Sequence, residues 1–439
     1  MGRDNDRALV SPRLATFLVF AINGAMVGTW VAHIPWLQDH LAVSKATLGL
    51  CLLCMAAGAL VSMPLTGRIL DRRSSGSVTR AATLVFCLML PLPLLATSPA
   101  MLAGILFVFG ATGGAMDVSM NAHGVAVERT LTKSSNQDDA RCRGAMGACD
   151  ARTQGAPIVP SIGATEDAAA RVHSAARRHS RHSDSSSKPI MSSLHGGWSV
   201  GGFVSAGVVA VAAASGVDPR LESLIVGVAL WLAALWITRR LGSASSHSRE
   251  GSPFALPSRA VIVIGGLCFL VMTTEGGISD WSGIYLRHAT GASSAVAATA
   301  FTGFSLGMAA ARLGGDALNA RLGAGRLLRG GMGLVAVALG GALLIGQTAP
   351  AVVGFALCGL GIANGVPLLF SAAGRLEPPN PSLAAAFTLG YTGFIVGPPL
   401  IGLLSDALGL PKTLALLVLA ALAVAVLGGR VSPAASHPA

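Results

Sequence analysis

Charged side chains are scarce in this sequence of 439 residues, where Asp, Glu, Lys and Arg together make up 12%. Soluble domains carry about 25% charged residues, so the composition excludes a water-soluble globular domain. Aromatic residues are also few, at 5%, whereas glycine is abundant, with 55 residues. Small residues let membrane helices approach closely, and this composition is typical of a chain that crosses the bilayer many times.

Long apolar segments occupy most of the chain, and each is long enough to cross the hydrocarbon core of a bilayer as a helix. The twelve segments cover residues 14–37, 46–66, 78–96, 100–127, 190–215, 221–238, 260–286, 294–314, 327–346, 350–374, 382–405 and 411–429. An even number of spans places both termini on the same side of the membrane. The sequence therefore predicts an all-α membrane protein with twelve transmembrane helices.

The basic residues of the chain follow the loops between these segments. The net charge is +11, and 26 of the 31 lysines and arginines fall in inside loops when the N-terminus is placed inside. Four fall in outside loops, and Arg312 lies near a helix end. The positive-inside rule explains this asymmetry, so the charge indicates topology and not a nucleic-acid partner. We expect a multi-pass protein of the bacterial inner membrane, with both termini cytoplasmic, and a monomer.

Motifs for enzymatic chemistry or for a cofactor are missing. Cys51-x-x-Cys54 lies inside an apolar segment without a second ligand pair, so two small packing residues explain it better than a zinc or redox site. The sequence has no H-E-x-x-H and no P-loop, and it places no serine nucleophile on a turn beside a His and an Asp. We expect no enzymatic activity, no cofactor and no metal.

The two halves of the chain repeat each other. Trp30 and Gly67 correspond to Trp281 and Gly315 at nearly the same offset, but the offset becomes shorter beyond residue 188. Residues 129–188 therefore have no counterpart in the second half. This insert is basic and lacks hydrophobic periodicity, and we predict that it is disordered.

The repeat predicts two parallel bundles of six helices, as in transporters built from two such halves. The expected units are an N-terminal bundle of residues 1–128 and 189–240, the cytoplasmic insert 129–188, a central cytoplasmic loop 241–258, a C-terminal bundle 259–430 and a tail 431–439.

The loops after the second and eighth spans carry related motifs. "GRILDRR" at 67–73 resembles the G-x-L-x-D-R-x-G signature of the major facilitator superfamily, and "GDALNARLG" at 315–323 resembles its second copy. "AMDVSMNAHG" at 115–124 resembles the fourth span of fucose-permease-like sugar/proton symporters. "EGGISDWSGIYL" and "SLHGGWSVGG" resemble the YbjJ-like bacterial branch. The resemblance implies the major facilitator fold and proton-coupled transport, although the first-span acid of those symporters is absent here.

These loop motifs are the candidate gate. Gly67 is expected to let two helices touch, and Asp71 to pair with arginines across the seam between the halves. Arg72 and Arg73 are expected to face the anionic inner leaflet. An ion pair that forms in one state and breaks in the other would control access. The candidate gating residues of the two copies are Gly67, Asp71, Arg72, Arg73, Gly315, Asp316 and Arg321.

Asp117 is the first candidate for proton binding, because an ionisable residue within a span costs about 2.5–3.5 kcal/mol on insertion scales and usually faces a cavity or a partner. Asn121 lies one turn away on the same helical face. His195 and Trp198 of the fifth span lie at a similar depth, so the four side chains are expected to line one cavity. The alternative is a structural hydrogen bond from Asp117 to a neighbouring helix.

Other polar and aromatic side chains extend this candidate site. Glu275 is the second candidate for proton binding, and Asp280 is the third, although solvation near the outer edge explains Asp280 equally well. The remaining candidates for solute binding are Asn23, Trp30, Trp281, Asn364 and Ser371. Helix packing explains the asparagines equally well.

Three functions fit these residues. The first is a proton-coupled secondary transporter of a small, sugar-like solute or another metabolite, which works by alternating access. The second is a proton-driven efflux antiporter of drugs or metabolites. The third is a membrane sensor that keeps the fold without transporting. The sequence favours the first, because the fourth span and "VPLLFSAAG" at 366–374 in the tenth resemble the corresponding spans of symporters.

Overall fold

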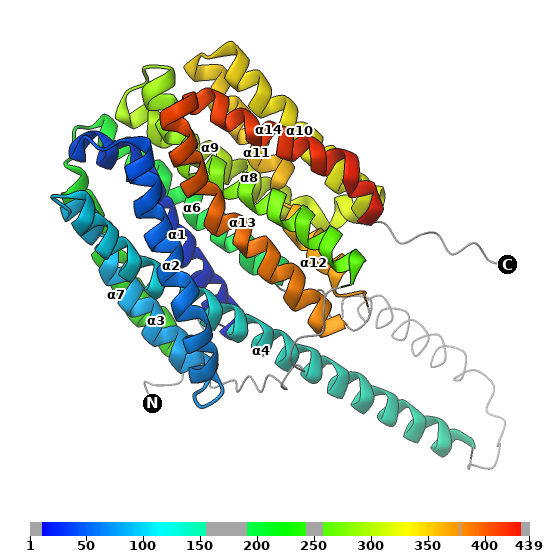
Figure 1. Ribbon diagram of the computed structural model, residues 1–439. Coiled ribbons are helices and arrows are strands. Elements are labelled where there is room, and N and C mark those ends of the chain that lie inside the picture. The colour runs from blue at the N-terminus through cyan, green and yellow to red at the C-terminus, as the bar shows by residue number, and fades with distance from the viewer. Residues whose placement is uncertain (1–10, 155–190, 243–257, 377–378, 432–439) are drawn as a thin grey trace. The chain divides into compact units, whose positions relative to one another are not determined.

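The computed structural model describes residues 11–154, 191–242, 258–376 and 379–431 (Figure 1). All regular structure in these ranges is helical, and twelve segments are long and apolar enough to cross a membrane. The prediction of an all-α protein with twelve transmembrane helices is therefore confirmed. Most of the expected central loop and of the expected tail lies outside the described residues.

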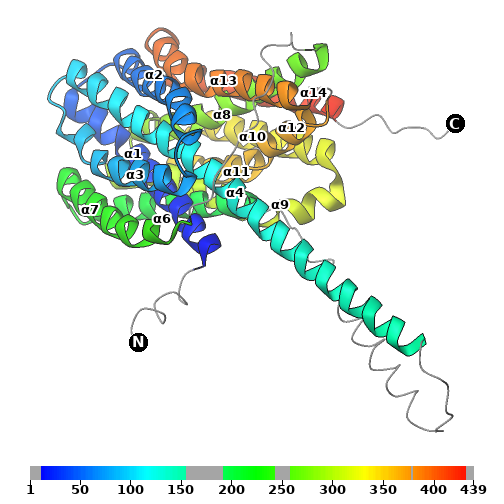
Figure 2. The ribbon, with the colours of Figure 1, turned by 90° about the horizontal axis from the view of Figure 1, so that it is seen from below.

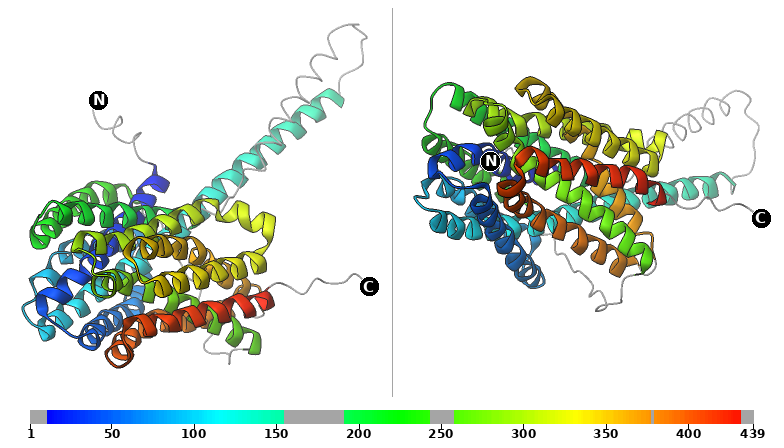
Figure 3. Two further views of the ribbon diagram at one scale, coloured as in Figure 1. Left: turned by 90° about the horizontal axis from the view of Figure 1, so that it is seen from above. Right: turned by 45° about the horizontal axis from the view of Figure 1, so that its top comes forward.

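The helices fall into two halves by chain order. The first half contains α1 (Pro12–Leu41), α2 (Lys45–Leu70), α3 (Ser75–Met89), α4 (Pro99–Gln154), α6 (Met191–Ala214) and α7 (Pro219–Ile237). The second half contains α8 (Arg259–Ala289), α9 (Ser294–Leu322), α10 (Ala324–Ile345), α11 (Thr348–Ile362), α12 (Gly365–Ala373), α13 (Pro379–Leu408) and α14 (Leu410–Leu427). Short 3-10 turns follow α3, α7 and α14 at Leu92–Leu95, Thr238–Arg240 and Gly428–Val431. Figure 3 shows the helices of the two halves side by side.

Serine side chains fix where several helices begin. Ser11, Ser44 and Ser74 each accept a hydrogen bond from a backbone N–H in the first turn of α1, α2 or α3. Ser258 and Ser293 do the same for α8 and α9. The first N–H groups of a helix have no partner inside it, and such a cap contributes about 1 kcal/mol. The polar residues between the apolar segments therefore set the helix starts.

The tenth span is broken near its middle. One helix is expected over 350–374, but α11 ends at Ile362 and α12 begins at Gly365. Pro367 lies in the first turn of α12 and has no N–H to bond to the carbonyl four residues earlier, which interrupts the helix. Asn364 lies at this break.

α4 is longer than the fourth predicted span. It continues through residues 129–154, the first part of the insert for which disorder is predicted. Its Ala, Arg, Lys and Gln residues favour helix, and extending an existing helix needs no new nucleus. Missing hydrophobic periodicity argues against packing and not against helix formation. Residues 155–188 lie outside the described residues, and residues 124–191 form a compact unit separate from the rest of the chain.

Contacts between the halves gather at one end of the helices. α13 packs along α8 in its own half and along α2 of the first half (Figure 1, Figure 2). Glycines allow this approach: a Cβ at Gly49 would lie 3.0 Å from the Pro399 carbonyl, and one at Gly402 would lie 2.6 Å from the Lys45 carbonyl. We call this end, marked by the turn 42–44, the Ala42 end. The opposite end, marked by the turn 71–74, is the Asp71 end.

Candidate functional site

An aspartate of the first half and a tyrosine of the second half meet through a hydrogen bond. The hydroxyl of Tyr391 on α13 donates to Oδ2 of Asp117 on α4, at 3.3 Å. Oδ1 of Asp117 accepts a second hydrogen bond from Nδ2 of Asn121, at 3.1 Å, because residues four apart share a helical face. Both carboxyl oxygens therefore have donors, and one of these donors joins the two halves.

Arg312 on α9 makes a second connection between the halves. Its Nη1 donates to Oγ of Ser199 on α6, at 2.8 Å, and lies 3.5 Å from the carbonyl oxygen of His195. Its Nη2 lies 3.9 Å from Oε1 of Glu275 on α8. The guanidinium carbon is 5.8 Å from the ring centroid of Trp198, within the range of a cation–π contact. Arg312 therefore links Glu275 to α6.

Contacts with α1 hold the side chains of α6 in place. Nε1 of Trp198 donates to Oδ1 of Asn23, at 2.8 Å, and the ring of Phe20 packs edge-on against His195, with centroids 5.3 Å apart. This approach requires Gly24, because a Cβ there would overlap the carbonyl of Trp198. The two helix backbones touch, and this contact fixes the positions of Trp198 and His195.

These contacts form two groups, one around Asp117 and one around Arg312, and Tyr391 of the first group interacts electrostatically with Glu275 of the second. We call the two groups together the central cluster. Its members are Asn23, Asp117, Asn121, His195, Trp198, Ser199, Glu275, Arg312 and Tyr391. Asn23 and Ser199 are buried, and the other members are half-buried. Glu275 keeps 16% of its side chain exposed and Arg312 keeps 13%, so the cluster is not sealed in dry packing.

The structure brings together six of the residues that the sequence predicts and adds three that it does not. The apolar segment 294–314 ends just beyond Arg312, which is why the sequence places this residue near a helix end. α9 continues to Leu322, so Arg312 lies about 15 Å from that end. Arg312 is the one charged residue of the apolar segment 294–314, and this is the signal that identifies it. Ser199 and Tyr391 carry no comparable signal.

Three other candidates lie outside the central cluster. Trp30 is 2% exposed and packs against Phe109, with ring centroids 5.7 Å apart. Trp281 is fully buried and donates from Nε1 to the carbonyl of Pro398, at 3.0 Å. Neither indole offers surface to a solute in this conformation. Asp280 is 9% exposed and has no hydrogen-bond or ion-pair partner among the described residues.

The two candidates of the tenth span make other contacts. Nδ2 of Asn364 lies 3.4 Å from the carbonyl oxygen of Ala311, so this side chain joins the helix break to α9. With Arg321, Asn364 lines a cavity of about 530 Å³ among α9, α10 and α11. Ser371 is exposed on α12. Among the described residues, no hydrogen bond or ion pair joins Asn364 or Ser371 to the central cluster.

The predicted ion-pair gate is not formed at the Asp71 end. Asp71, Arg72 and Arg73 are exposed and make no ion pair with any residue that the structure describes. A Cβ at Gly67 would meet nothing within 4 Å, so the expected close helix contact at Gly67 is not formed in this conformation. The reason is that α2 meets the second half at its other end.

The second copy of the motif differs from the first. Gly315 is tightly packed, since a Cβ there would overlap the side-chain oxygen of Asn364. Arg321 is exposed, and the side chain of Asp316 lies outside what the structure describes. The close helix contact expected of the motif glycine therefore occurs in the second copy.

Polar contacts join the halves at the Ala42 end. Nε of Arg287 on α8 donates to Oδ2 of Asp39 on α1, at 2.7 Å, and Nε2 of His288 lies 3.4 Å from the other oxygen of that carboxylate. The backbone N–H of Ala46 donates to Oδ2 of Asp406 on α13, at 3.2 Å. Each contact runs from the first half to the second, so this end is closed.

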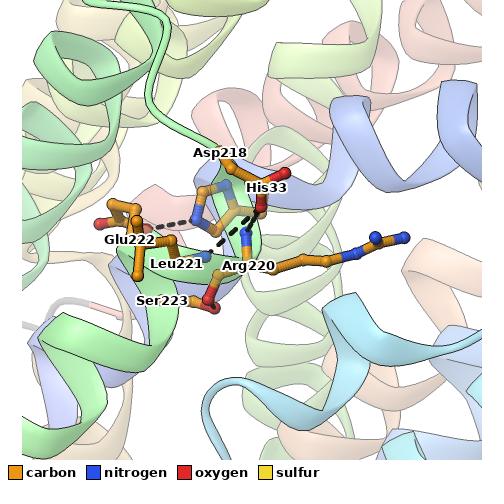
Figure 4. A network of polar contacts seen from close by, with 6 residues as sticks. All are labelled: His33, Asp218, Arg220, Leu221, Glu222 and Ser223. Atoms are coloured by element: carbon orange, nitrogen blue, oxygen red, sulfur yellow. Dashed lines mark hydrogen bonds and ion pairs between the residues drawn. The ribbon is translucent and has the colours of Figure 1, made fainter.

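No sequence motif marks a buried hydrogen-bonded pair within the first half. Nε2 of His33 on α1 lies 2.7 Å from Oε2 of Glu222 in the first turn of α7, and both side chains are 5% exposed. Figure 4 shows this pair beside the α7 N-terminus, where Asp218 accepts hydrogen bonds from the backbone N–H groups of Arg220 and Leu221. Oε1 of Glu222 has no hydrogen-bond partner among the described residues.

The described part of the chain contains no group of three or more His, Cys, Asp or Glu residues that could hold a metal ion. Cys51 and Cys54 are both free thiols. Sγ of Cys51 donates to the carbonyl of Pro99, and Cys54 is half-buried. Cys51 and Cys54 therefore pack between helices.

Relatives with matching sequences cover nearly the whole chain. The model of the Major Facilitator Superfamily matches residues 5–127. An uncharacterized MFS-type transporter of Yersinia pestis is 30% identical over 418 residues, which cover 95% of this chain and 94% of that protein. Membrane protein MosC of Rhizobium meliloti is 28% identical over 411 residues, which cover 92% of this chain and 86% of that protein.

Solved structures of transporters share the fold. A bacterial homolog of the human lysosomal transporter Spinster, in an inward-facing and occupied conformation, covers 95% of this chain and 96% of its own, with a TM-score of 0.66 and 13% identity. The nucleoside transporter NupG covers 96% of this chain and 99% of its own, with a TM-score of 0.62 and 11% identity. At these identities the likeness concerns the fold alone.

Proposed function

The chain belongs to the Major Facilitator Superfamily and is a multi-pass secondary transporter, and from this premise we propose that it couples the movement of a small polar solute to that of protons. The solute is sugar-like or another small metabolite, and Asp117 takes up the proton. The observation that carries the proposal is the hydrogen bond from Tyr391 in the second half to Asp117 in the first.

The chemistry of this hydrogen bond supports a role in coupling. Ionisable residues within membrane spans are costly and usually mark ion or substrate pathways. Hydrogen bonds to an ionised acceptor are roughly twice as strong as those between neutral groups. Proton uptake by Asp117 therefore weakens its contact with Tyr391. The weaker contact lets α13 separate from α4, which is the motion that alternating access needs.

Contacts at the two ends support an inward-facing arrangement. The positive-inside rule places the Asp71 end, with its many arginines, in the cytoplasm of a bacterial cell. Both termini of this monomeric inner-membrane protein then lie inside. The Ala42 end faces outward and is closed by the ion pair of Asp39 and Arg287. The outward-facing state breaks that pair and lets Asp71 pair across the seam.

Polar and aromatic groups of the central cluster suit a hydroxylated solute. Asn121 offers an amide next to the carboxyl group, and the ring of Trp198 can stack on a sugar face. Glu275 is the second candidate for proton binding, since it lies on the opposite half and is partly exposed. Asp280 is the third, as a buried carboxyl without a hydrogen-bond partner in the described part of the chain.

Uptake measurements on purified protein test the proposal. A thermal-shift screen against sugars, nucleosides, amino acids and drugs first identifies a ligand. In proteoliposomes, the wild type accumulates this ligand when an inward proton gradient is imposed. Asp117→Asn loses this accumulation and keeps exchange of labelled for unlabelled ligand without a gradient. Unchanged accumulation in Asp117→Asn would remove this residue from the mechanism, and Glu275→Gln and Asp280→Asn then identify which carboxyl acts instead.

A further inference from the structure

The guanidinium of Arg312 uses only one of its two edges for hydrogen bonds. Nη1 donates to Ser199 and points to the carbonyl of His195. Nε and Nη2 form the other edge, whose two N–H groups point the same way and match the two oxygens of a carboxylate. Nε is buried and has no hydrogen-bond partner among the described residues. Nη2 is 3.9 Å from Glu275, beyond the usual limit of about 3.2 Å.

Other titratable groups face this pair from three helices. Tyr391 on α13 interacts electrostatically with Glu275 and also with Asp117, which lies on α4. His195 on α6 interacts electrostatically with Arg312. Arg312 is the only cation in the central cluster when His195 is neutral, and Glu275 is its only ion-pair partner among the described residues. Loss of the negative charge on Glu275 therefore leaves the charge of Arg312 uncompensated.

We infer that Arg312 binds a carboxylate group of the transported solute, and that Glu275 takes up a second proton, in addition to that of Asp117, as it gives up its place beside Arg312 to this carboxylate. The inference rests on the proposed function and narrows its substrate class to small organic acids, sugar acids among them. Because a buried charge without a counter-ion is costly, proton and anion enter together. This proton neutralises Glu275 while the anion neutralises Arg312, so the exchange does not change the net charge around Arg312.

The hydrogen bonding of the cluster favours an anionic solute over a cationic one. A cation would need a carboxylate that is not already engaged, but both oxygens of Asp117 accept hydrogen bonds, and the charge of Glu275 is balanced by Arg312. Arg312 instead has free donors, because neither Nε nor Nη2 of its guanidinium has an acceptor at hydrogen-bond distance among the described residues. The planar shape of that edge suits a carboxylate, and a lysine could not reproduce it.

Matched pairs of neutral and acidic sugars test the inference. Purified protein is titrated with glucose and glucuronate, with galactose and galacturonate, and with gluconate. We expect the acids to bind the wild type at least about tenfold more tightly than their neutral partners, as for charge-assisted hydrogen bonds. Arg312→Gln loses this preference, and Arg312→Lys keeps the charge but binds the acids more weakly than the wild type. Arg326→Gln, at an exposed arginine of α10, is the matched control.

Proton uptake during binding separates a direct role from a structural one. In weakly buffered solution, the wild type takes up protons when it binds glucuronate, whereas Glu275→Gln binds the acid with about one proton fewer. Equal binding of neutral and acidic sugars, acid binding that survives in Arg312→Gln, or no binding of any acid in the set would overturn the inference. Proton-driven accumulation of a neutral sugar that depends on Asp117 would keep the proposed function and overturn this inference alone.

Discussion

The hydroxyl of Tyr391 lies 3.3 Å from Oδ2 of Asp117 and joins α13 of the second half to α4 of the first, across 274 residues of sequence. Asn121 holds the other carboxyl oxygen from within α4. The bond to Tyr391 is therefore the one that can break when the halves move. A change of charge on Asp117 acts directly on a contact between the halves.

Tyr391→Phe should slow proton-driven uptake about tenfold or more. The substitution removes the donor to Asp117 and keeps the ring that stacks on Phe387, with centroids 4.5 Å apart. Hydrogen bonds to charged groups contribute about 1.5–3 kcal/mol, and about 1.4 kcal/mol corresponds to a tenfold change in rate. Uptake into proteoliposomes measures the effect.

Tyr285→Phe is the matched control for this prediction. Its hydroxyl donates to the carbonyl of Ala342 within the second half, at 3.2 Å, and makes no contact with Asp117. Uptake by Tyr285→Phe should stay near that of the wild type. Equal rates for Tyr391→Phe and the wild type would show that the contact between Tyr391 and Asp117 does not affect transport.

Reversing the charge of Arg287 should open the Ala42 end. Arg287→Asp places an acid beside Asp39, with which Arg287 forms a partly exposed ion pair at 2.7 Å. Such pairs contribute about 0.2–1 kcal/mol, so we expect a cysteine introduced at Lys45 to react with a maleimide about 2–5 times faster. Adding Asp39→Arg to the same protein should restore the wild-type rate. No recovery in the double variant would argue against a direct pair.

Hydropathy and isolated charges were sufficient to predict the spans and part of the cluster. Each apolar segment matches a helix, or in the tenth span the two helices α11 and α12, because a span must satisfy its own backbone hydrogen bonds within the bilayer. Asp117 and Glu275 were found because an acid inside an apolar run is costly. The same rule identifies Arg312 once α9 is known to continue to Leu322.

The partners of these charges could not be predicted from the sequence. Tyr391 approaches Asp117, and Arg287 approaches Asp39, only because the halves pack in one particular way. The repeat relates the halves to each other but does not specify the contacts between them. The gate expected at Asp71 illustrates the limit, since a motif identifies residues that can pair and not the state in which they do.

Gly24→Ala should destabilise the first half. A Cβ at Gly24 would overlap the carbonyl of Trp198, so α6 must move away from α1 and the hydrogen bond to Asn23 is lost. Overpacking of this kind costs about 1–3 kcal/mol, and the melting temperature in detergent should fall accordingly. Gly333→Ala is the control, because a Cβ there meets nothing within 4 Å and alanine favours helix. A melting temperature unchanged by Gly24→Ala would contradict this contact.

Glu222→Ala should lower the free energy of unfolding more than Gly24→Ala does. Glu222 and His33 are both 5% exposed, and truncating one member of a buried pair leaves the other polar group without a partner. Such a loss lowers the free energy of unfolding by about 3–5 kcal/mol. The carboxylate also lies in the first turn of α7, where the helix dipole favours negative charge. Thermal unfolding in detergent measures the change.

Replacing both members of this pair distinguishes pairing from packing. His33→Leu combined with Glu222→Leu leaves no buried polar side chain at this position and keeps most of the volume. Because well-packed apolar residues often replace a buried ion pair at little cost, the double variant should be more stable than Glu222→Ala. A double variant as unstable as Glu222→Ala would mean that the shape of the two side chains, and not their hydrogen bond at 2.7 Å, holds α1 against α7.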